Sequence, residues 1–155
     1  MSGFEIAGLV LGGFPILLNI LDYYERSFAP LDEWWHFRRH FVQFVDDISQ
    51  QQMLFQQNLA LLLDPVIDDN ETFTSLLNDP GATAWEAANL SEILGKRLGL
   101  HRTRFLRVLT DMDKLMIKLR KLLGVKDDGS VRAVHISWPL LASSLTRVER
   151  LGSQW

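Results

Sequence analysis

Residues 4–21 read FEIAGLVLGGFPILLNIL, and this stretch decides the fold. Between Glu5 and Asp22 it contains no charged residue, whereas the rest of the chain is rich in charged side chains. A helix that is apolar all round is normally surrounded by other helices, because every one of its faces must leave water. The stretch therefore predicts the central helix of an all-α bundle of four to five helices.

The same stretch has three other interpretations. A secretory signal peptide starts with Lys or Arg, but this chain starts with MSGFE. A permanent transmembrane helix needs about 20 apolar residues, and the glycines and Pro15 weaken this shorter stretch as a helix. The third interpretation is compatible with the bundle, because a helix buried at rest could be released on activation and enter a membrane. The pattern Gly8-Leu-Val-Leu-Gly12 allows close helix packing in lipid, and small residues do the same in a soluble core.

The membrane interpretation gives each residue of the stretch a role. Three small residues, Gly8, Gly12 and Gly13, would let helices pack closely. The apolar side chains would enter the bilayer; they are Phe4, Ile6, Leu9, Val10, Leu11, Phe14, Ile16, Leu17 and Leu18.

Apolar residues at spacings of three and four predict further helices. The first helix should end at Ala29-Pro30, and Pro15 predicts either a kink or an early turn. Asp32 is the predicted N-cap of a second helix over 33–63, with Trp34 and Trp35 packed near its start. The other predicted elements of this single domain, 1–155, are a short acidic helix or turn at 66–79, a helix at 89–97 ended by Gly99, a long helix at 101–123 ended by Gly124, and a last helix at 138–151.

Composition narrows the function. With 47% hydrophobic residues the chain is not disordered as a whole, and the absence of Cys removes disulfides, thiolate zinc sites and Cys nucleophiles. A net charge of −3 and the lack of any recognition motif argue against nucleic acid as a partner.

Charge is unevenly distributed along the chain. Residues 64–92 carry seven acids and no Lys or Arg, whereas residues 96–126 carry ten bases and two acids. Either these segments neutralise each other within the fold, or they bind partners of opposite sign. Basic residues beside the apolar stripe of the 101–123 helix could bind anionic lipid headgroups or a protein partner, or form an ordinary solvated face; they are Arg102, Arg104, Arg107, Lys114, Lys118 and Lys121.

No catalytic motif is present, and we expect a non-enzymatic protein without a cofactor or metal. His36 and His40 lie four residues apart, a spacing that can bind a metal, but no third ligand is evident. A small enzyme or ligand-binding bundle using these two histidines is the least favoured hypothesis. A soluble helical adaptor that binds protein partners without membrane activity is the second.

Several segments resemble one known family. They read SGFEIAGLVLGGFPILLNILDYYE from residue 2, WWHFRRHF from 34, MLFQQNLALLLDPVIDD from 53, LLNDPGATAW from 76 and LGKRLG from 94. Across about residues 2–125 the chain resembles the N-terminal helical domains of fungal proteins of the HeLo-like cell-death class, which precede kinase-like or nucleotide-binding modules. The positions that carry the pattern most closely are Glu5 to Gly12 and Pro15.

The resemblance implies a signalling domain of regulated cell death or incompatibility. In such a domain the N-terminal apolar helix is exposed on activation, the protein self-associates, and the membrane is permeabilised. The expected partners are anionic membrane lipids, further copies of the chain, and a kinase-like or nucleotide-binding signalling protein. The expected location is the cytoplasm, with relocation to the plasma membrane on activation.

Overall fold

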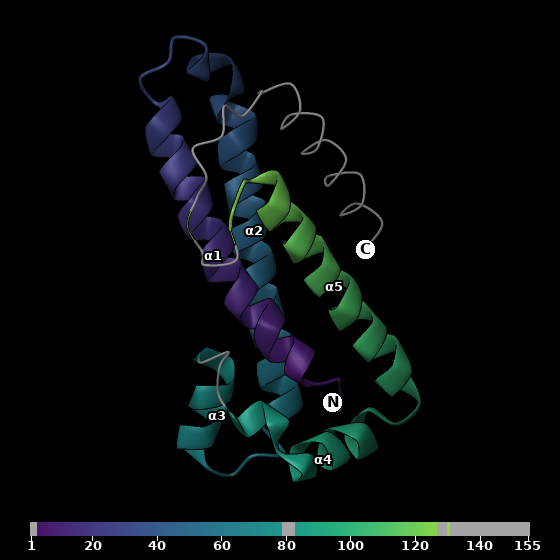
Figure 1. Ribbon diagram of the computed structural model, residues 1–155. Coiled ribbons are helices and arrows are strands. Elements are labelled where there is room, and N and C mark those ends of the chain that lie inside the picture. Colours follow the sequence, from purple (N-terminus) through teal and green to yellow (C-terminus); the bar gives the residue numbers. More distant parts are fainter. Residues whose placement is uncertain (1–2, 79–82, 127–129, 131–155) are drawn as a thin grey trace.

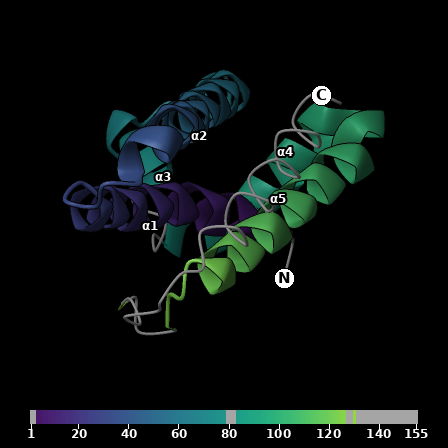
Figure 2. The same cartoon turned by 90° about the horizontal axis from the view of Figure 1, so that it is seen from above.

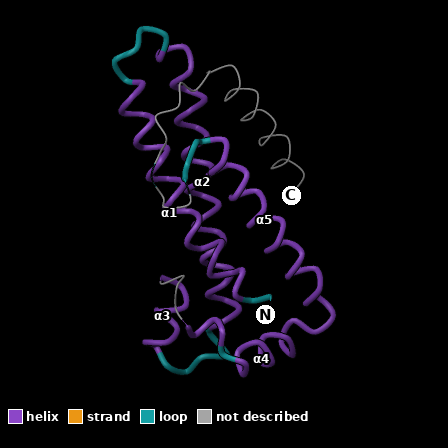
Figure 3. The backbone as a smooth tube through the Cα atoms, in the orientation of Figure 1, coloured by secondary structure: helices purple, strands orange, loops and turns teal. Residues whose placement is uncertain are grey.

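The structure, a computed structural model, describes residues 3–78, 83–126 and 130, and these residues form an all-α bundle without strands (Figures 1 and 3). The described α-helices are α1 (Glu5–Phe28), α2 (Trp34–Leu63), α3 (Asn70–Asn78), α4 (Ala88–Leu98) and α5 (Arg102–Leu122). Two short 3-10 helices, η1 (Thr83–Glu86) and η2 (Gly99–His101), precede α4 and α5. The predicted all-α bundle with an apolar N-terminal helix is confirmed, and the helix predicted at 138–151 lies outside the described residues.

The two other long helices both pack against α1. Helix α2 returns antiparallel to α1 after a short turn, and α3 and α4 then carry the chain across one end of the bundle (Figure 1). Helix α5 starts at that end and so runs parallel to α1, with Phe105 beside Phe4 and Leu123 beside Tyr24. Viewed from above, α2 and α5 lie on different sides of α1 (Figure 2).

The hydrophobic core has two parts, and α1 contributes to both. Towards its C-terminal end, residues from Val10 to Tyr24 pack with the first half of α2 and the second half of α5. Towards its N-terminal end, Phe4, Ala7 and Leu11 pack with the end of α2, with α3, η1 and α4, and with the start of α5. Because α1 contacts neighbours on several sides, those sides must be apolar, and this explains why no charged residue occurs between Glu5 and Asp22.

Helix boundaries agree closely with the apolar periodicity, but some capping predictions are wrong. Pro15 lies within α1 on its exposed side, and the helix continues through it, so no early turn forms there. The residue before α2 is Glu33 and not the predicted Asp32, and it makes no side-chain capping bond. Gly99 and Gly124 follow α4 and α5 with positive φ angles of 50° and 70°, which glycine adopts without a Cβ penalty.

The two neighbouring tryptophans have different environments. Trp34 is 6% exposed and packs edge-on against Phe41 with ring centroids 5.3 Å apart. Trp35 is 76% exposed, and its ring lies 6.0 Å from the guanidinium carbon of Arg38. The prediction that both tryptophans are packing residues is therefore wrong for Trp35, because one step along a helix rotates a side chain by about 100°.

The acidic segment at 66–79 forms a helix that begins with a side-chain cap. Asp69 precedes α3 and accepts hydrogen bonds from the hydroxyl and the backbone N–H of Thr72. These bonds favour the ionised carboxylate and hold the pKa of Asp69 below its ordinary value. At the other end of α3, Trp85 Nε1 donates a hydrogen bond of 2.9 Å to the carbonyl oxygen of Leu76.

Candidate functional site

Helix α1 is the part of the chain with the clearest capacity for a function beyond folding. Among the described residues it is the one helix long and apolar enough to cross a membrane. The core helix of a soluble protein has the same length and composition, so these two properties alone do not distinguish the two roles. The two roles therefore have to be compared through the burial and the contacts of the α1 side chains.

Most of the side chains predicted to enter a bilayer are withdrawn from water in the bundle. Phe4, Val10, Leu11, Phe14 and Leu17 are buried. Ile6, Ile16 and Leu18 are partly buried, whereas Leu9 is 56% exposed. The exposed side of α1 also carries Pro15 and Asn19. Proline, the weakest helix former, therefore lies on a side of α1 that the described helices leave exposed.

Of the three glycines predicted to allow close packing, Gly13 has a defined neighbour. A Cβ atom built on Gly13 would lie closer to the sulfur of Met116 on α5 than non-bonded atoms approach. Gly8 is buried and Gly12 is partly buried. Met116 itself could not be paired with Gly13 from the sequence, because apolar spacing identifies core residues and not their partners across the bundle.

Both ends of α1 are anchored to α5. At the N-terminal end the Phe4 ring lies 6.3 Å from the ring of Phe105, and the guanidinium carbon of Arg102 lies 5.8 Å from the Phe4 ring. At the C-terminal end the Tyr24 hydroxyl donates a buried hydrogen bond of 2.6 Å to the carbonyl oxygen of Leu123.

The environment of Tyr24 also affects its ionisation. Burial raises the pKa of Tyr24 above its ordinary value of 10.0, and the adjacent Tyr23 raises that pKa further. Sequence reasoning did not single out Tyr24, although an aromatic hydroxyl on an apolar stripe is a signal that a buried hydrogen-bond partner is needed.

The six basic residues predicted to bind lipid or a partner are all exposed on α5. Four of them fall on one face opposite the core, because their spacings of seven, four and three residues bring them into line; we call Arg107, Lys114, Lys118 and Lys121 the basic face. Arg104 lies beside this face, and Arg102 instead reaches over Phe4. The whole of α5 carries seven bases and two acids.

The acidic segment and the basic helix do not form ion pairs with each other in the described part of the chain. The two ion pairs found there join Arg26 to Asp22 at 2.8 Å and Lys96 to Glu92 at 2.6 Å, each within one helix. No ion pair of the basic face is found among residues 3–78, 83–126 and 130, and its four side chains are exposed. Asp111 lies on the same side of α5, between Arg107 and Lys114, and offsets part of their charge.

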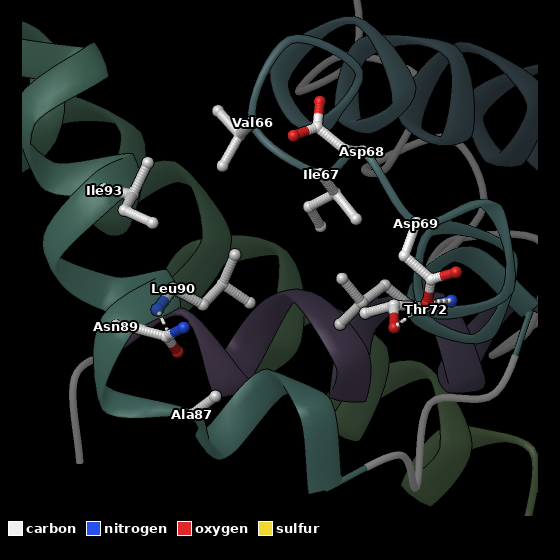
Figure 4. A pocket seen from close by; sticks show the side chains of 10 residues that line it. Val66, Ile67, Asp68, Asp69, Thr72, Ala87, Asn89, Leu90 and Ile93 are labelled. Atoms are coloured by element: carbon white, nitrogen blue, oxygen red, sulfur yellow. Dashed lines mark hydrogen bonds between the residues drawn. The ribbon is translucent and has the colours of Figure 1, made fainter.

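A pocket of about 380 Å³ opens between the 64–69 loop, α3 and α4 (Figure 4). Apolar side chains line most of it, including Ile67, Leu90 and Ile93. Its carboxylate at Asp69 and its hydroxyl at Thr72 are bonded to each other as the cap of α3. Asp69 and Thr72 are thus engaged in helix capping, and the other polar side chains that line the pocket are those of Asp68 and Asn89.

The histidines do not assemble into a metal centre in the described structure. His36 and His40 are exposed on α2, and no group of three His, Asp or Glu side chains close enough to hold a metal ion occurs among the described residues. The α1–α5 pair and the basic face remain as the candidate functional surfaces. Comparisons of the chain with protein families, curated proteins and solved structures find no match.

Proposed function

We propose that the chain is a non-enzymatic signalling domain that permeabilises membranes by transferring α1 from the bundle into the bilayer. One observation carries the proposal: the one described helix able to cross a membrane is also the helix around which the core is built. The likeness of residues 2–125 to HeLo-like cell-death domains supports the same function, with a location in the cytoplasm and then at the plasma membrane.

The position of α1 makes its release a change of the whole domain. Because α1 contacts both α2 and α5, it leaves only if these helices separate from it. The cost is then comparable to the full free energy of unfolding, about 5–15 kcal/mol for a domain. A resting state with α1 inside is thus stable, and activation needs a binding partner that favours the open state.

Membrane binding supplies free energy of the same order. Ten Leu, Ile, Val and Phe residues lie between Ile6 and Leu21, and at roughly 0.3–0.6 kcal/mol each they favour insertion by about 3–6 kcal/mol. The four residues of the basic face add about 1 kcal/mol each at an anionic surface. These favourable terms sum to about 7–10 kcal/mol, and transfer of the Asn19 amide into hydrocarbon opposes them. The gross sum lies within the range that release requires.

The length of the apolar run sets the geometry in the bilayer. The sixteen uncharged residues from Ile6 to Leu21 extend about 24 Å as a helix, against a hydrocarbon core of about 30 Å. Glu5 and Asp22 would then lie at the two interfaces, and the bilayer would thin locally to meet them. Such thinning favours leakage.

A soluble adaptor is the second candidate function. It is favoured by the extent to which α1 is used in the core, where its largest apolar side chains are already satisfied by α2 and α5. In this function the domain stays closed and binds a protein, such as a kinase-like or nucleotide-binding signalling partner, through an exposed surface.

Pro15 provides a test that separates folding from insertion. It is exposed in the bundle but lies near the middle of the apolar run, so Pro15→Asp leaves the core intact and places a charge near the bilayer centre. A charge there costs about 2.5–3.5 kcal/mol, which lowers the insertion equilibrium roughly 100-fold. Pro15→Asn has nearly the same shape without the charge and serves as the matched control.

The measurement is dye release from anionic and neutral liposomes, with circular dichroism as the folding control. We expect release from anionic liposomes by the original chain and by Pro15→Asn, and loss of release by Pro15→Asp at unchanged helical content. Equal release by both variants would reject insertion of α1. Absence of release by every form at all lipid compositions would favour the adaptor function.

A further inference from the structure

The second half of α2 exposes a surface without charge. Ile48 to Leu63 contains no Asp, Glu, Lys or Arg over sixteen residues, or about 24 Å of helix. One side of this segment is in the core, where Leu59 and Leu63 are 2% and 0% exposed. The opposite side exposes Met53, Leu54 and Leu61, and Leu61 reaches 71%.

These exposed residues form one continuous stripe. We call Gln50, Met53, Leu54, Gln57 and Leu61 the α2 outer face; spacings of three and four residues align them opposite the core, and all five are exposed. A solvated helix face ordinarily carries charged side chains, as the basic face of α5 does. The α2 outer face departs from this rule over about three turns, which marks it as a surface that a partner covers.

We propose that the α2 outer face binds the same face of a second copy of this chain in an antiparallel, two-fold arrangement. In a two-fold contact the residues near the axis meet their own copies, so a charge there would face an identical charge, and a charge-free face avoids this repulsion. Each Gln amide both donates and accepts hydrogen bonds, so Gln50 and Gln57 can pair with amides of the second copy. Methionine and apolar side chains supply the contact area.

The charges at the two ends of the face favour the antiparallel direction. Asp46 and Asp47 lie beyond one end, and Asp64 lies beyond the other. At that second end Arg97 of α4 reaches the carbonyl oxygen of Leu61 with its Nη2 atom at 3.4 Å. An antiparallel pair places both Arg97 and Asp64 near Asp46 and Asp47 of the second copy, so that Arg97 offsets part of the repulsion between the acids. A parallel pair would place Asp46 and Asp47 against their own copies without a nearby base.

A bilayer is a poorer occupant of this face than a second copy. The amide groups of Gln50 and Gln57 would lose their hydrogen-bond partners in hydrocarbon. The acids at both ends of the face would also be repelled by anionic lipid. The inference therefore concerns a different surface from α1 and the basic face, and it does not depend on membrane activity.

The test is sedimentation velocity of the lipid-free chain of 155 residues from low micromolar to submillimolar concentration. We expect a reversible monomer–dimer equilibrium, and we expect Leu61→Glu to raise its dissociation constant by roughly tenfold or more. Leu100→Glu is the matched control, because Leu100 is fully exposed in η2 and lies off the face. A chain that stays monomeric throughout, or a Leu61→Glu variant that dimerises like the original, would overturn the proposal whatever the liposome result.

The direction of pairing is tested by cysteine cross-linking, since the chain has no native Cys. Chains with Gln50→Cys and chains with Gln57→Cys are mixed and oxidised at a concentration where the dimer forms. The antiparallel pair predicts that the mixed disulfide between the two variants predominates. Predominance of disulfides between identical variants would overturn the antiparallel arrangement.

Discussion

The close approach of α1 to α5 at Gly13 makes a quantitative prediction for Gly13→Ala. The added Cβ would overlap with the Met116 sulfur but would lie 3.6 Å and 3.7 Å from the Met116 Cγ and Cβ atoms, which are ordinary contact distances. Only the sulfur must move, by about 1 Å, to restore normal contact. Overpacking of this kind costs about 1–3 kcal/mol.

Alanine also favours the helix, which offsets part of that cost. Replacing a mid-helix glycine by alanine stabilises a helix by about 0.5–1 kcal/mol. The expected net effect of Gly13→Ala is a loss of about 1 kcal/mol in the free energy of unfolding, or about 2–4 °C in Tm for a domain of this size. Urea unfolding followed by circular dichroism measures this loss.

The second half of the experiment uses Met116→Ala to remove the obstructing sulfur. That change alone costs about 2–5 kcal/mol because it leaves a cavity. In its background Gly13→Ala should become stabilising by about 0.5–1 kcal/mol, since only the helix propensity term remains. The same destabilisation by Gly13→Ala in both backgrounds would refute the proposed contact, because uncoupled sites add independently.

Four further predictions concern Tyr24, the basic face and the length of the apolar run. Tyr24→Phe removes the buried bond to the Leu123 carbonyl and should lower the free energy of unfolding by about 1–2 kcal/mol in urea titrations; an unchanged midpoint would show that the bond contributes nothing. Because the folded-state pKa of Tyr24 is raised above 10.0, the contribution of Tyr24 to the free energy of unfolding should be complete below pH 10 and be lost as the pH rises through the folded-state pKa. The Tyr24→Phe variant should not show this alkaline loss of stability. Replacing Arg107, Lys114 and Lys118 together by Gln should weaken binding to anionic vesicles by roughly 3 kcal/mol, about 100-fold, without altering helical content; unchanged vesicle flotation would exclude the basic face as the docking surface. Dye release should be faster from thin bilayers of short-chain lipids than from thick ones, because the apolar run is about 6 Å shorter than a typical hydrocarbon core; release that does not depend on thickness would argue against a spanning helix.

Much of the architecture could be predicted from the sequence because the signals are local. Spacings of three and four define α2 and α5 to within one residue, and the lack of charge between Glu5 and Asp22 identifies α1 as the central helix. The position of Trp35 could also have been predicted. Trp34 continues the apolar stripe through Phe41, and its neighbour necessarily points elsewhere.

The remaining features depend on which helices meet, and that information is not local. The approach of Gly13 to Met116 joins residues more than a hundred positions apart, and the bond from Tyr24 to Leu123 spans 99 positions. The α2 outer face is a feature of the same kind. Its apolar residues could serve as core until the structure places α1 on the opposite side of α2.

The central claim is that α1 moves from the bundle into lipid, and a probe on α1 tests it most directly. Pro15→Cys introduces one reactive thiol on the exposed side of the helix, and an environment-sensitive fluorophore on it reports water at rest. Leu100→Cys carries the same fluorophore as the control. The anionic vesicles contain lipids that carry a quencher at the bilayer centre. On their addition, the emission of the label at position 15 should shift to the blue and be quenched while the vesicles release dye. The label at position 100 should stay in water. Leakage of the vesicles with the label at position 15 still exposed to water would contradict the account.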